Sequence, residues 1–266
     1  MSKQSSIPAA DAFDPLDTMP PAKKSMVLFF LVDTSSSMEG SKLESLNSVM
    51  SDILPELIGV GEAGTDVKIA VMSFSSGFEW ITPEPVRIEE YQTWTPLQAD
   101  GVTDLGEACE ELASKLSRHS FLKAPSLSFA PVIFLITDGY PTDNYRKGIE
   151  QLKKNRWFRY GLKVALAIGS SVDLDVLKEF TDDDELVLQA FGADMLKKLV
   201  REIAVTSSKI GSSSMVLTDT SRERTEEEVA GTKKAQMIEA VQEMKEDILE
   251  DIESLDDLDI DFDEGW

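Results

Sequence analysis

Residues 27–38 read VLFFLVDTSSSM, and this stretch decides how the rest of the chain is interpreted. Six apolar residues, Val27 to Val32, run directly into Asp33, and a cluster of hydroxyl side chains follows. A continuous apolar run is typical of a strand that is covered on both faces in a parallel sheet. Ligands bind outside the carboxyl ends of such strands. Asp33 and the hydroxyls behind it are therefore candidate site residues.

Further apolar strands alternate with amphipathic helices along the chain. Strands are predicted over residues 67–74, 132–137 and 162–168, and helices over 42–58, 105–116, 173–180 and 193–205. This alternation predicts an α/β fold, doubly wound, with a mostly parallel central sheet flanked by helices.

The composition divides the chain into four parts. We expect a flexible N-terminal segment over residues 1–25, one domain over 26–208, a polar linker over 209–234 and an acidic amphipathic tail over 235–266. From Gln236 to Trp266 there are thirteen acidic residues and one basic residue, Lys245. The tail is either a solubilising segment or a helix over 235–255 that docks on a partner or back on the domain. Its candidate partner-binding side chains are Val241, Met244, Ile248, Ile252, Leu255, Phe262 and Trp266.

The overall charge limits the possible partners. The 266 residues include 49 acidic and 26 basic ones, a formal net charge of −23. Such a chain repels nucleic acid and anionic membranes, so we expect neither as a partner. The sequence has one cysteine, which excludes an internal disulfide. No apolar run approaches the roughly 20 residues of a membrane helix, and the N-terminus has no signal-peptide core. We therefore expect a cytoplasmic protein.

A second acid and a further hydroxyl follow the same pattern as Asp33. Asp138 ends the predicted strand 132–137, and Thr103 lies before the predicted helix 105–116. In a doubly wound sheet these loops can converge with Ser35 and Ser37 at one edge. Two carboxylates and three hydroxyls form a set of hard oxygen ligands, which suits Mg²⁺ or Mn²⁺.

Three motifs resemble those of one known family. DTSSSM at 33–38, GVTDLGEA at 101–108 and ITDGYPTD at 136–143 are similar to the metal-ion-dependent adhesion site of von Willebrand factor A domains. The resemblance covers residues 26–207 and implies a metal-dependent protein interaction module. It implies hydroxyl ligation by Ser35, Ser37 and Thr103, with Asp33 and Asp138 binding directly or through waters. Ser36 stands where that family usually has glycine, so the motif does not determine the backbone conformation of the loop at this residue.

A narrower resemblance suggests a cellular setting. The stretches LITDGYPTDNYRKGIEQLKK and ALAIGSSVDLDVLKEFTDDDELVLQA are similar to bacterial TerY-type proteins of tellurite-resistance and stress loci. That resemblance implies a Ser/Thr kinase and a PP2C-type phosphatase as partners. An alternative is an accessory subunit of an AAA-type ATPase that inserts metals or remodels complexes.

Catalysis is not expected, although a metal-dependent hydrolase is a third possibility. The chain has no Gly-rich phosphate loop with a lysine. The single histidine, His119, is expected to be a solvated residue after a helix. Cys109 is expected to pack inside the domain. A catalytic nucleophile needs a base beside it, and the sequence shows no such pair.

Overall fold

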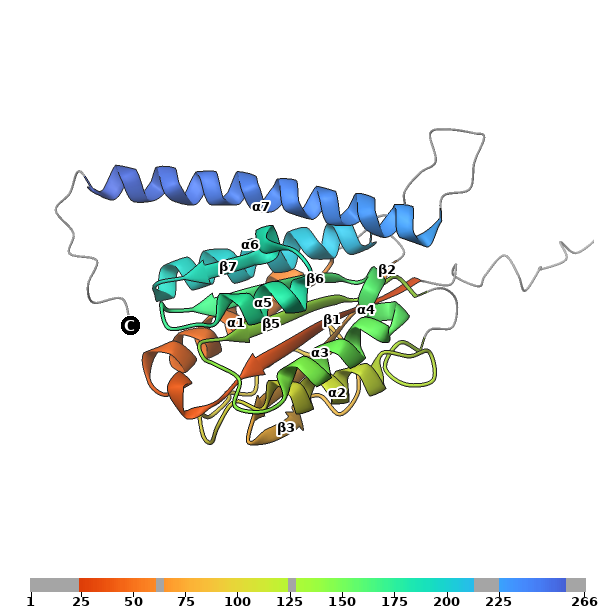
Figure 1. The fold of residues 1–266 in the computed structure, drawn as a ribbon. Helices are drawn as coiled ribbons and strands as arrows, with labels where there is room; N and C mark the ends of the chain where they lie inside the picture. The colour runs from red at the N-terminus through yellow and green to blue at the C-terminus, as the bar shows by residue number, and fades with distance from the viewer. Residues whose placement is uncertain (1–23, 61–64, 124–127, 213–224, 257–266) are drawn as a thin grey trace, which may run out of the picture.

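The structure is a computed structural model that describes residues 24–60, 65–123, 128–212 and 225–256. Strands and helices alternate around one central sheet (Figure 1). In chain order the elements, with η for a short 3-10 helix, are β1 (Lys24–Asp33), η1 (Ser36–Met38), α1 (Ser41–Leu57), β2 (Thr65–Ser75), β3 (Gly77–Trp80), β4 (Val86–Arg87), α2 (Leu105–Lys115), β5 (Val132–Thr137), α3 (Tyr145–Lys154), α4 (Arg156–Tyr160), β6 (Leu162–Ile168), α5 (Leu174–Thr181), η2 (Asp184–Leu186), β7 (Val187–Ala190), α6 (Ala193–Ser212) and α7 (Glu226–Asp256).

The sheet has the predicted doubly wound, mostly parallel arrangement. Its strand order is β3-β2-β1-β5-β6-β7, and β4 also pairs with β2. Every pair from β2 to β7 along this order is parallel. The short strands β3 and β4 run antiparallel to β2 and were not predicted from the sequence. The prediction of the fold class is confirmed.

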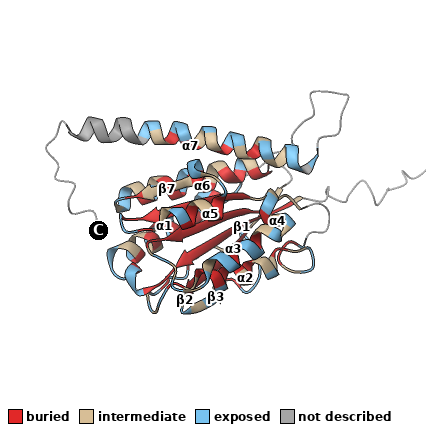
Figure 2. Ribbon diagram, viewed as in Figure 1, coloured by how far each residue is buried: buried red, intermediate tan, exposed pale blue. Residues whose placement is uncertain are grey.

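Strand β1 lies inside the sheet, and its two faces enter two different hydrophobic clusters. Leu28 and Phe30 pack with α1 and α6, whereas Phe29 and Leu31 pack with α2 and α3. All four side chains are fully buried, and the sheet is buried on both faces (Figure 2). A strand between two layers of helices has no solvated face, which explains why its sequence is apolar without alternation.

Helix α6 continues past the point where the sequence suggested a linker. Ser207, Ser208 and Ser212 are fully buried in it. A Cβ atom on Gly211 would lie 2.7 Å from the sulfur of Met26, so only a hydrogen at this position lets α6 approach β1. The predicted linker over 209–234 is thus too long, because small polar residues serve here as packing residues.

Helix α7 also begins earlier than predicted, at Glu226 rather than Ala235. The Thr225 hydroxyl accepts a hydrogen bond from the Glu228 backbone N–H at 3.2 Å. The Glu228 carboxylate in turn accepts from the Thr225 N–H at 2.8 Å. This reciprocal arrangement is a capping box, which satisfies backbone donors at a helix start. Of the predicted linker, residues 213–224 lie outside the described residues, as does the predicted flexible segment up to residue 23.

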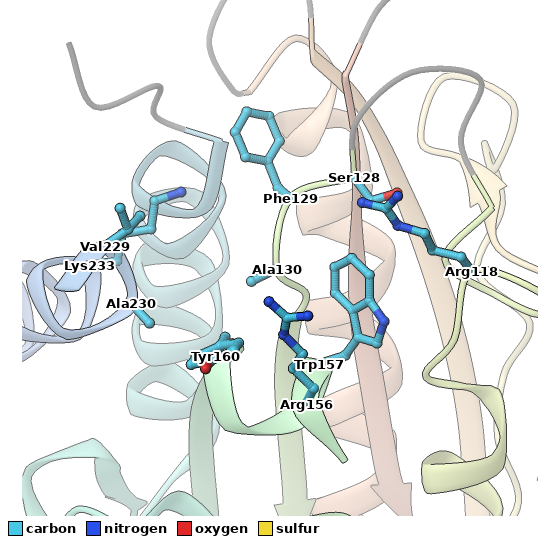
Figure 3. A pocket seen from close by; sticks show the side chains of 10 residues that line it. All are labelled: Arg118, Ser128, Phe129, Ala130, Arg156, Trp157, Tyr160, Val229, Ala230 and Lys233. Carbon is cyan, nitrogen blue, oxygen red and sulfur yellow. The ribbon is translucent and has the colours of Figure 1, made fainter. Parts of the chain in front are cut away.

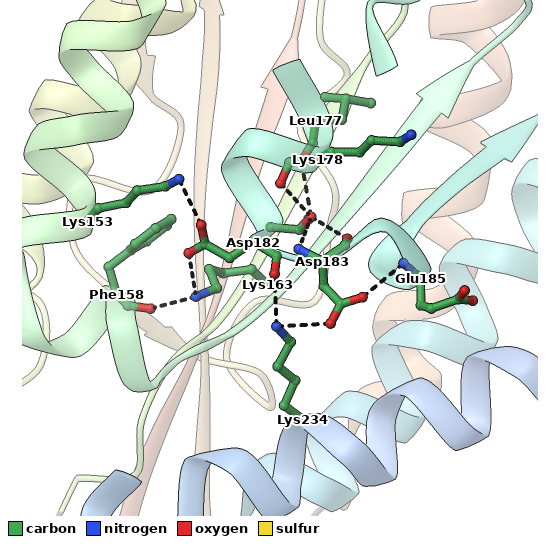
Figure 4. A network of polar contacts seen from close by, with 10 residues as sticks. Lys153, Phe158, Lys163, Leu177, Lys178, Asp182, Asp183, Glu185 and Lys234 are labelled. Atoms are coloured by element: carbon green, nitrogen blue, oxygen red, sulfur yellow. Dashed lines mark hydrogen bonds and ion pairs between the residues drawn. The ribbon is translucent and has the colours of Figure 1, made fainter. Parts of the chain in front are cut away.

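The tail helix docks on its own domain. Met237 and Val241 are fully buried in the same cluster as α1 and α6. The Lys234 ammonium lies 3.0 Å from both the Asp182 carbonyl oxygen and an Asp183 carboxylate oxygen (Figure 4). Asp182 also pairs with Lys153 at 2.7 Å, which ties α7 to α3 through the end of α5. Within the described residues, no helix is both long and apolar enough to span a membrane.

We expect Gly148→Ala to destabilise the domain and Gly231→Ala to stabilise it. A Cβ atom on Gly148 would lie 2.8 Å from the Cα atom of Gly106, so α3 and α2 would have to separate. Such overpacking costs about 1–3 kcal/mol. A Cβ atom on Gly231 in α7 meets nothing within 4 Å. There alanine gains about 0.5–1 kcal/mol of helix propensity.

Urea unfolding of both variants measures these two changes. Equal effects of the two substitutions on the midpoint would contradict the close approach of α2 and α3.

Candidate functional site

The candidate site lies where β1 and β5 end at the same edge of the sheet (Figure 1). The parallel register pairs Val32 with Ile136, so Asp33 and Thr137 follow at the same level. The Thr137 hydroxyl donates a 2.5 Å hydrogen bond to the Asp33 carboxylate. Thr137 therefore fixes one carboxylate oxygen of Asp33.

The loop after Asp33 presents two hydroxyls side by side. The Ser35 backbone N–H donates to Asp33 Oδ1 at 2.8 Å, which turns the chain into η1. The Oγ atoms of Ser35 and Ser37 are 3.0 Å apart. Two ligands at right angles on an ion with bonds of about 2.1 Å would also lie about 3.0 Å apart. The hydroxyls thus have the spacing of neighbouring ligands on a magnesium-sized ion.

Ser36 fits this loop without backbone strain. Among the non-glycine residues that the structure describes, only Asp182 has a positive φ. The Ser36 N–H donates to the Gly101 carbonyl at 3.0 Å, which joins the serine loop to the loop that carries Thr103. A serine in place of the family's usual glycine is therefore compatible with the site.

Asp138 connects the β5 edge to the serine loop. The Ser37 hydroxyl donates to Asp138 Oδ1 at 2.7 Å. The Lys42 ammonium lies 2.5 Å from Asp138 Oδ2 and donates to the Ser37 carbonyl at 3.2 Å. Lys42 was not among the predicted site residues, although its position in the first turn of the helix after DTSSSM indicates a cation near the site. Its charge offsets one of the two carboxylates.

Oxygens from all three loops surround one small space beside Gly139. A Cβ atom built there would lie 3.4 Å from Ser37 Oγ, 3.6 Å from Thr103 Oγ1 and 3.9 Å from Asp33 Oδ2. Thr103 is held by its backbone, which donates to the Thr142 hydroxyl at 3.0 Å and accepts from the Thr142 N–H at 2.8 Å. The structure thus brings together the five residues predicted as metal ligands. That they bind a metal stays a prediction.

Two buried carboxyl groups, Asp33 and Asp138, lie at this edge, and a bound cation would offset the cost of burying their charge. Asp33 is fully buried, and burial raises the pKa of its carboxyl above the usual value. Hydrogen bonds from Thr137 and Ser35 lower that pKa, while the neighbouring Asp138 raises it further. Among the described residues, no three His, Cys, Asp or Glu side chains are grouped to hold a metal. A metal at this edge would therefore depend on hydroxyl oxygens.

Two of the residues predicted to bind a partner are already in contact with the domain. Val241 is fully buried, and Met244 is 7% exposed in the same cluster. As α7 lies here it packs on α6, so these two side chains belong to the domain core, and partner binding by them stays a prediction. Ile248, Ile252 and Leu255 belong to α7, but their side chains are not described, and Phe262 and Trp266 lie outside the described residues.

The remaining nucleophile and base candidates lie away from this edge. Cys109 is fully buried on α2, and burial raises the pKa of its thiol far above the usual range. His119 is exposed in the turn after α2. Neither side chain lies at the Asp33 site, so neither supports catalysis there.

The architecture and this edge define an α/β domain whose loops gather acids and hydroxyls around one point. Over residues 28–202 the sequence matches the von Willebrand factor type A domain family. The match covers more than half of the 266 residues, and the chain belongs to that family.

Known proteins similar to this chain come from several organisms. The human inter-alpha-trypsin inhibitor heavy chain H6 is 25% identical over 70% of this chain, and the pig heavy chain H4 is 25% identical over 66%. The chain spans only 15% and 21% of those two relatives. Their whole-protein activities are therefore no guide to this chain.

Solved structures show the same fold at lower identity. A von Willebrand factor type A protein from Catenulispora acidiphila has a TM-score of 0.53 and 19% identity over 70% of this chain and 43% of its own. Proximal thread matrix protein 1 from the mussel byssus, with a zinc-occupied MIDAS motif, has a TM-score of 0.51 and 20% identity over 70% and 46%. The pilus adhesin SpaC from Lactobacillus rhamnosus GG has a TM-score of 0.56 and 13% identity over 72% and 31%.

We expect Gly139→Ala to weaken divalent-metal binding at least tenfold while leaving the fold intact. The added methyl would lie between the oxygens of Ser37, Thr103 and Asp33 at ordinary contact distances, so it fills the space without a clash. Titration calorimetry with Mg²⁺ and Mn²⁺ measures the change in affinity.

Gly192→Ala is the matched control, because a Cβ atom there meets nothing within 4 Å. If Gly139→Ala bound either ion as tightly as Gly192→Ala, the space beside Gly139 would not be the metal position.

Proposed function

We propose that this protein is a metal-dependent protein interaction module that recognises an acidic side chain of its partner. The observation that carries the proposal is the convergence of Ser37, Thr103 and Asp33 oxygens from three separate loops on the space beside Gly139. A divalent ion bound there would supply an electrophilic centre with an open position for a partner's carboxylate. The zinc-occupied MIDAS motif of the mussel protein supports a divalent ion in this fold.

Two kinds of oxygen ligand would hold such an ion. Ser35, Ser37 and Thr103 would offer hydroxyl oxygens, and Asp33 and Asp138 would bind directly or through waters. All five are oxygen ligands, which favours Mg²⁺ or Mn²⁺ over softer metals. Two carboxylates would balance the formal charge of a divalent ion, but Lys42 already pairs with Asp138, so the site as a whole would keep a positive charge. That residual charge makes a carboxylate from a partner a strong additional ligand.

Hydrogen bonds keep these groups in place before any partner arrives. Thr137 orients Asp33, and Ser37 and Lys42 together hold both oxygens of Asp138. Preorganised groups lose little conformational freedom on binding, so more of the interaction energy remains for recognition. The arrangement serves binding rather than catalysis, and we propose that the protein is not an enzyme.

The partners we propose are a Ser/Thr kinase and a PP2C-type phosphatase of a bacterial stress or tellurite-resistance system. Support comes from the resemblance of the ITDGYPTD motif at 136–143, and of the helix after it, to TerY-type proteins. The surplus of acidic residues is consistent with protein partners and disfavours nucleic acid.

We expect partner capture to require both the metal and Asp138. Tagged full-length protein is incubated with a lysate of its native host in Mg²⁺, and bound proteins are identified by mass spectrometry. EDTA and the Asp138→Ala substitution should each reduce recovery at least tenfold, because the ion and its ligand are part of the contact.

Ser114→Ala is the control, since that hydroxyl contacts only Glu111 on the exposed side of α2. Recovery in EDTA equal to that in Mg²⁺ would overturn the metal-dependent mechanism. Metal-dependent capture that contains neither a kinase nor a phosphatase would overturn the proposed partners alone.

A further inference from the structure

Exposed apolar side chains lie beside the candidate metal site. Val102 directly precedes Thr103, and Tyr140 directly follows Gly139. Phe78 lies in β3, next to the carboxyl end of β2. The side chains of Phe78, Val102 and Tyr140 are all exposed, and we call these three residues the apolar rim. Exposed apolar groups that border a polar site are typical of a surface that binds another segment of chain.

The other exposed apolar side chains show that this placement is uneven. Among the described residues, the remaining large exposed ones are Phe191 and Ile58. Phe191 follows β7 at the same edge of the sheet, whereas Ile58 follows α1 at the opposite edge. Four of these five side chains thus lie where the strands end. Singly scattered surface residues would not gather in this way.

Helix α7 runs toward this edge, in the same general direction as β1 (Figure 1). Its start borders a cavity of about 630 Å³ that lies before β5 and is also lined by Phe129 and Tyr160 (Figure 3). Further along α7, the Lys245 ammonium donates to the Glu185 carbonyl at 3.3 Å, just before β7 begins. The helix therefore starts at the edge where the strands begin and passes the start of β7.

The end of α7 lies level with the carboxyl ends of the strands. From Lys245 to Asp256 the helix rises about 16 Å. The four residues of β7 rise only about 13 Å. The end of β1 lies three strand spacings from β7, about 14 Å. The ten residues 257–266 span up to about 33 Å when extended, so this segment can reach the metal site.

Residues 257–266 lie outside the described residues, but their sequence has the composition that this surface favours. They read DLDIDFDEGW, with five acidic residues and no basic one. From Asp257 to Asp263 the acids alternate with Leu258, Ile260 and Phe262. In an extended chain, alternate side chains point to opposite sides. Carboxylates on one side could then reach the metal while apolar side chains on the other contact the rim.

We propose that residues 257–266 bind across this edge of the same molecule, with one carboxylate on the metal ion and apolar side chains against the apolar rim. This contact rests on the proposed function, because it uses the same ion as a partner's carboxylate. The positive charge of the ion and of Lys42 favours an acidic segment. A ligand on the same chain has an effective concentration of about 1 mM. A partner must therefore displace the segment before it can bind.

Competition with a peptide tests this contact on the full-length protein. The probe is a fluorescently labelled synthetic peptide with the sequence of residues 257–266, and fluorescence anisotropy in Mg²⁺ measures its affinity. Asp257 is too close to α7 to reach the site, so a segment variant changes the other four acids: Asp259→Asn, Asp261→Asn, Asp263→Asn and Glu264→Gln. If the peptide Kd is about 0.1 mM, a competing segment at about 1 mM weakens its binding to the unmodified protein about tenfold. The segment variant should show that gain in affinity.

The matched control removes four negative charges from exposed positions of α7 instead, through Glu239→Gln, Glu243→Gln, Glu246→Gln and Asp247→Asn. It should bind the peptide as weakly as the unmodified protein does, which separates release of the segment from a general loss of repulsion. An equal gain in this control would overturn the proposal.

A second pair of substitutions tests the apolar rim. In the segment variant, Val102→Ser should weaken peptide binding about threefold or more, because apolar contact area is lost. Ile58→Ser is the control, since Ile58 and Val102 are both 47% exposed but lie at opposite edges. Equal affinities of these two variants would remove the rim from the contact.

Other results would also overturn the proposal. Equal affinity of the unmodified protein and the segment variant would show that the segment does not occupy the site. A dimer of the unmodified protein in Mg²⁺ that the segment variant lacks, measured by sedimentation, would assign the segment to a second copy. Peptide binding that persists in EDTA would exclude contact through the metal.

Calorimetry with Mg²⁺ distinguishes failure of this contact from failure of the proposed function. If Mg²⁺ binds but the peptide binds to no variant, only the contact with residues 257–266 is overturned. If Mg²⁺ does not bind, the metal-dependent interaction is overturned as well.

Discussion

The parallel pairing of β1 with β5 is the constraint on which the rest of the structure depends. It sets Val32 opposite Ile136, and so places Asp33 and Thr137 at one level with Asp138 directly after them. A slip of one residue would turn every side chain of β1 to the other face of the sheet. Leu28 and Phe30 would then leave one cluster, and Phe29 and Leu31 the other. The two hydrophobic cores therefore fix the register that builds the site.

Lys42 gives the site a charge balance that the bare motif does not show. Its ammonium contacts Asp138 Oδ2, so the edge carries two carboxylates and one fixed cation. A divalent ion would share Asp138 with that ammonium. At an effective dielectric constant of about 20, two unit charges 4 Å apart interact by about 4 kcal/mol. Lys42 thus orients Asp138 and would repel an ion bound beside it.

The sequence was sufficient to predict the strands that have continuous apolar runs. The strands over 132–137 and 162–168 have the predicted bounds, because continuous apolar runs end at polar loops. The order of acids and hydroxyls also located the loops that meet at Gly139. These features are local, and the parallel sheet turns local order into proximity in space.

Other features depend on contacts between distant segments, and no local pattern in the sequence indicates them. Ser212 was assigned to the predicted linker because that region is polar, yet it is fully buried in α6. Met237 and Val241 have the spacing of an amphipathic helix, but that pattern does not say which surface they cover. Arg118, Arg156 and Lys233 form no motif, since the turn after α2, helix α4 and helix α7 bring them to one cavity only in the folded chain.

Helix α7 lies beyond the residues that match the family, and it makes several of these contacts. By burying Met237 and Val241 it extends the core, and through Lys234 it is tied to Asp182 and Asp183. Its first turns then close a basic cavity at one edge of the sheet, while the acidic site lies at the other. The cavity lies before β5 and the candidate metal site after it, so α7 borders the first and not the second. The added helix therefore runs from one edge of the sheet to the other, and it brings the segment that follows it within reach of the site.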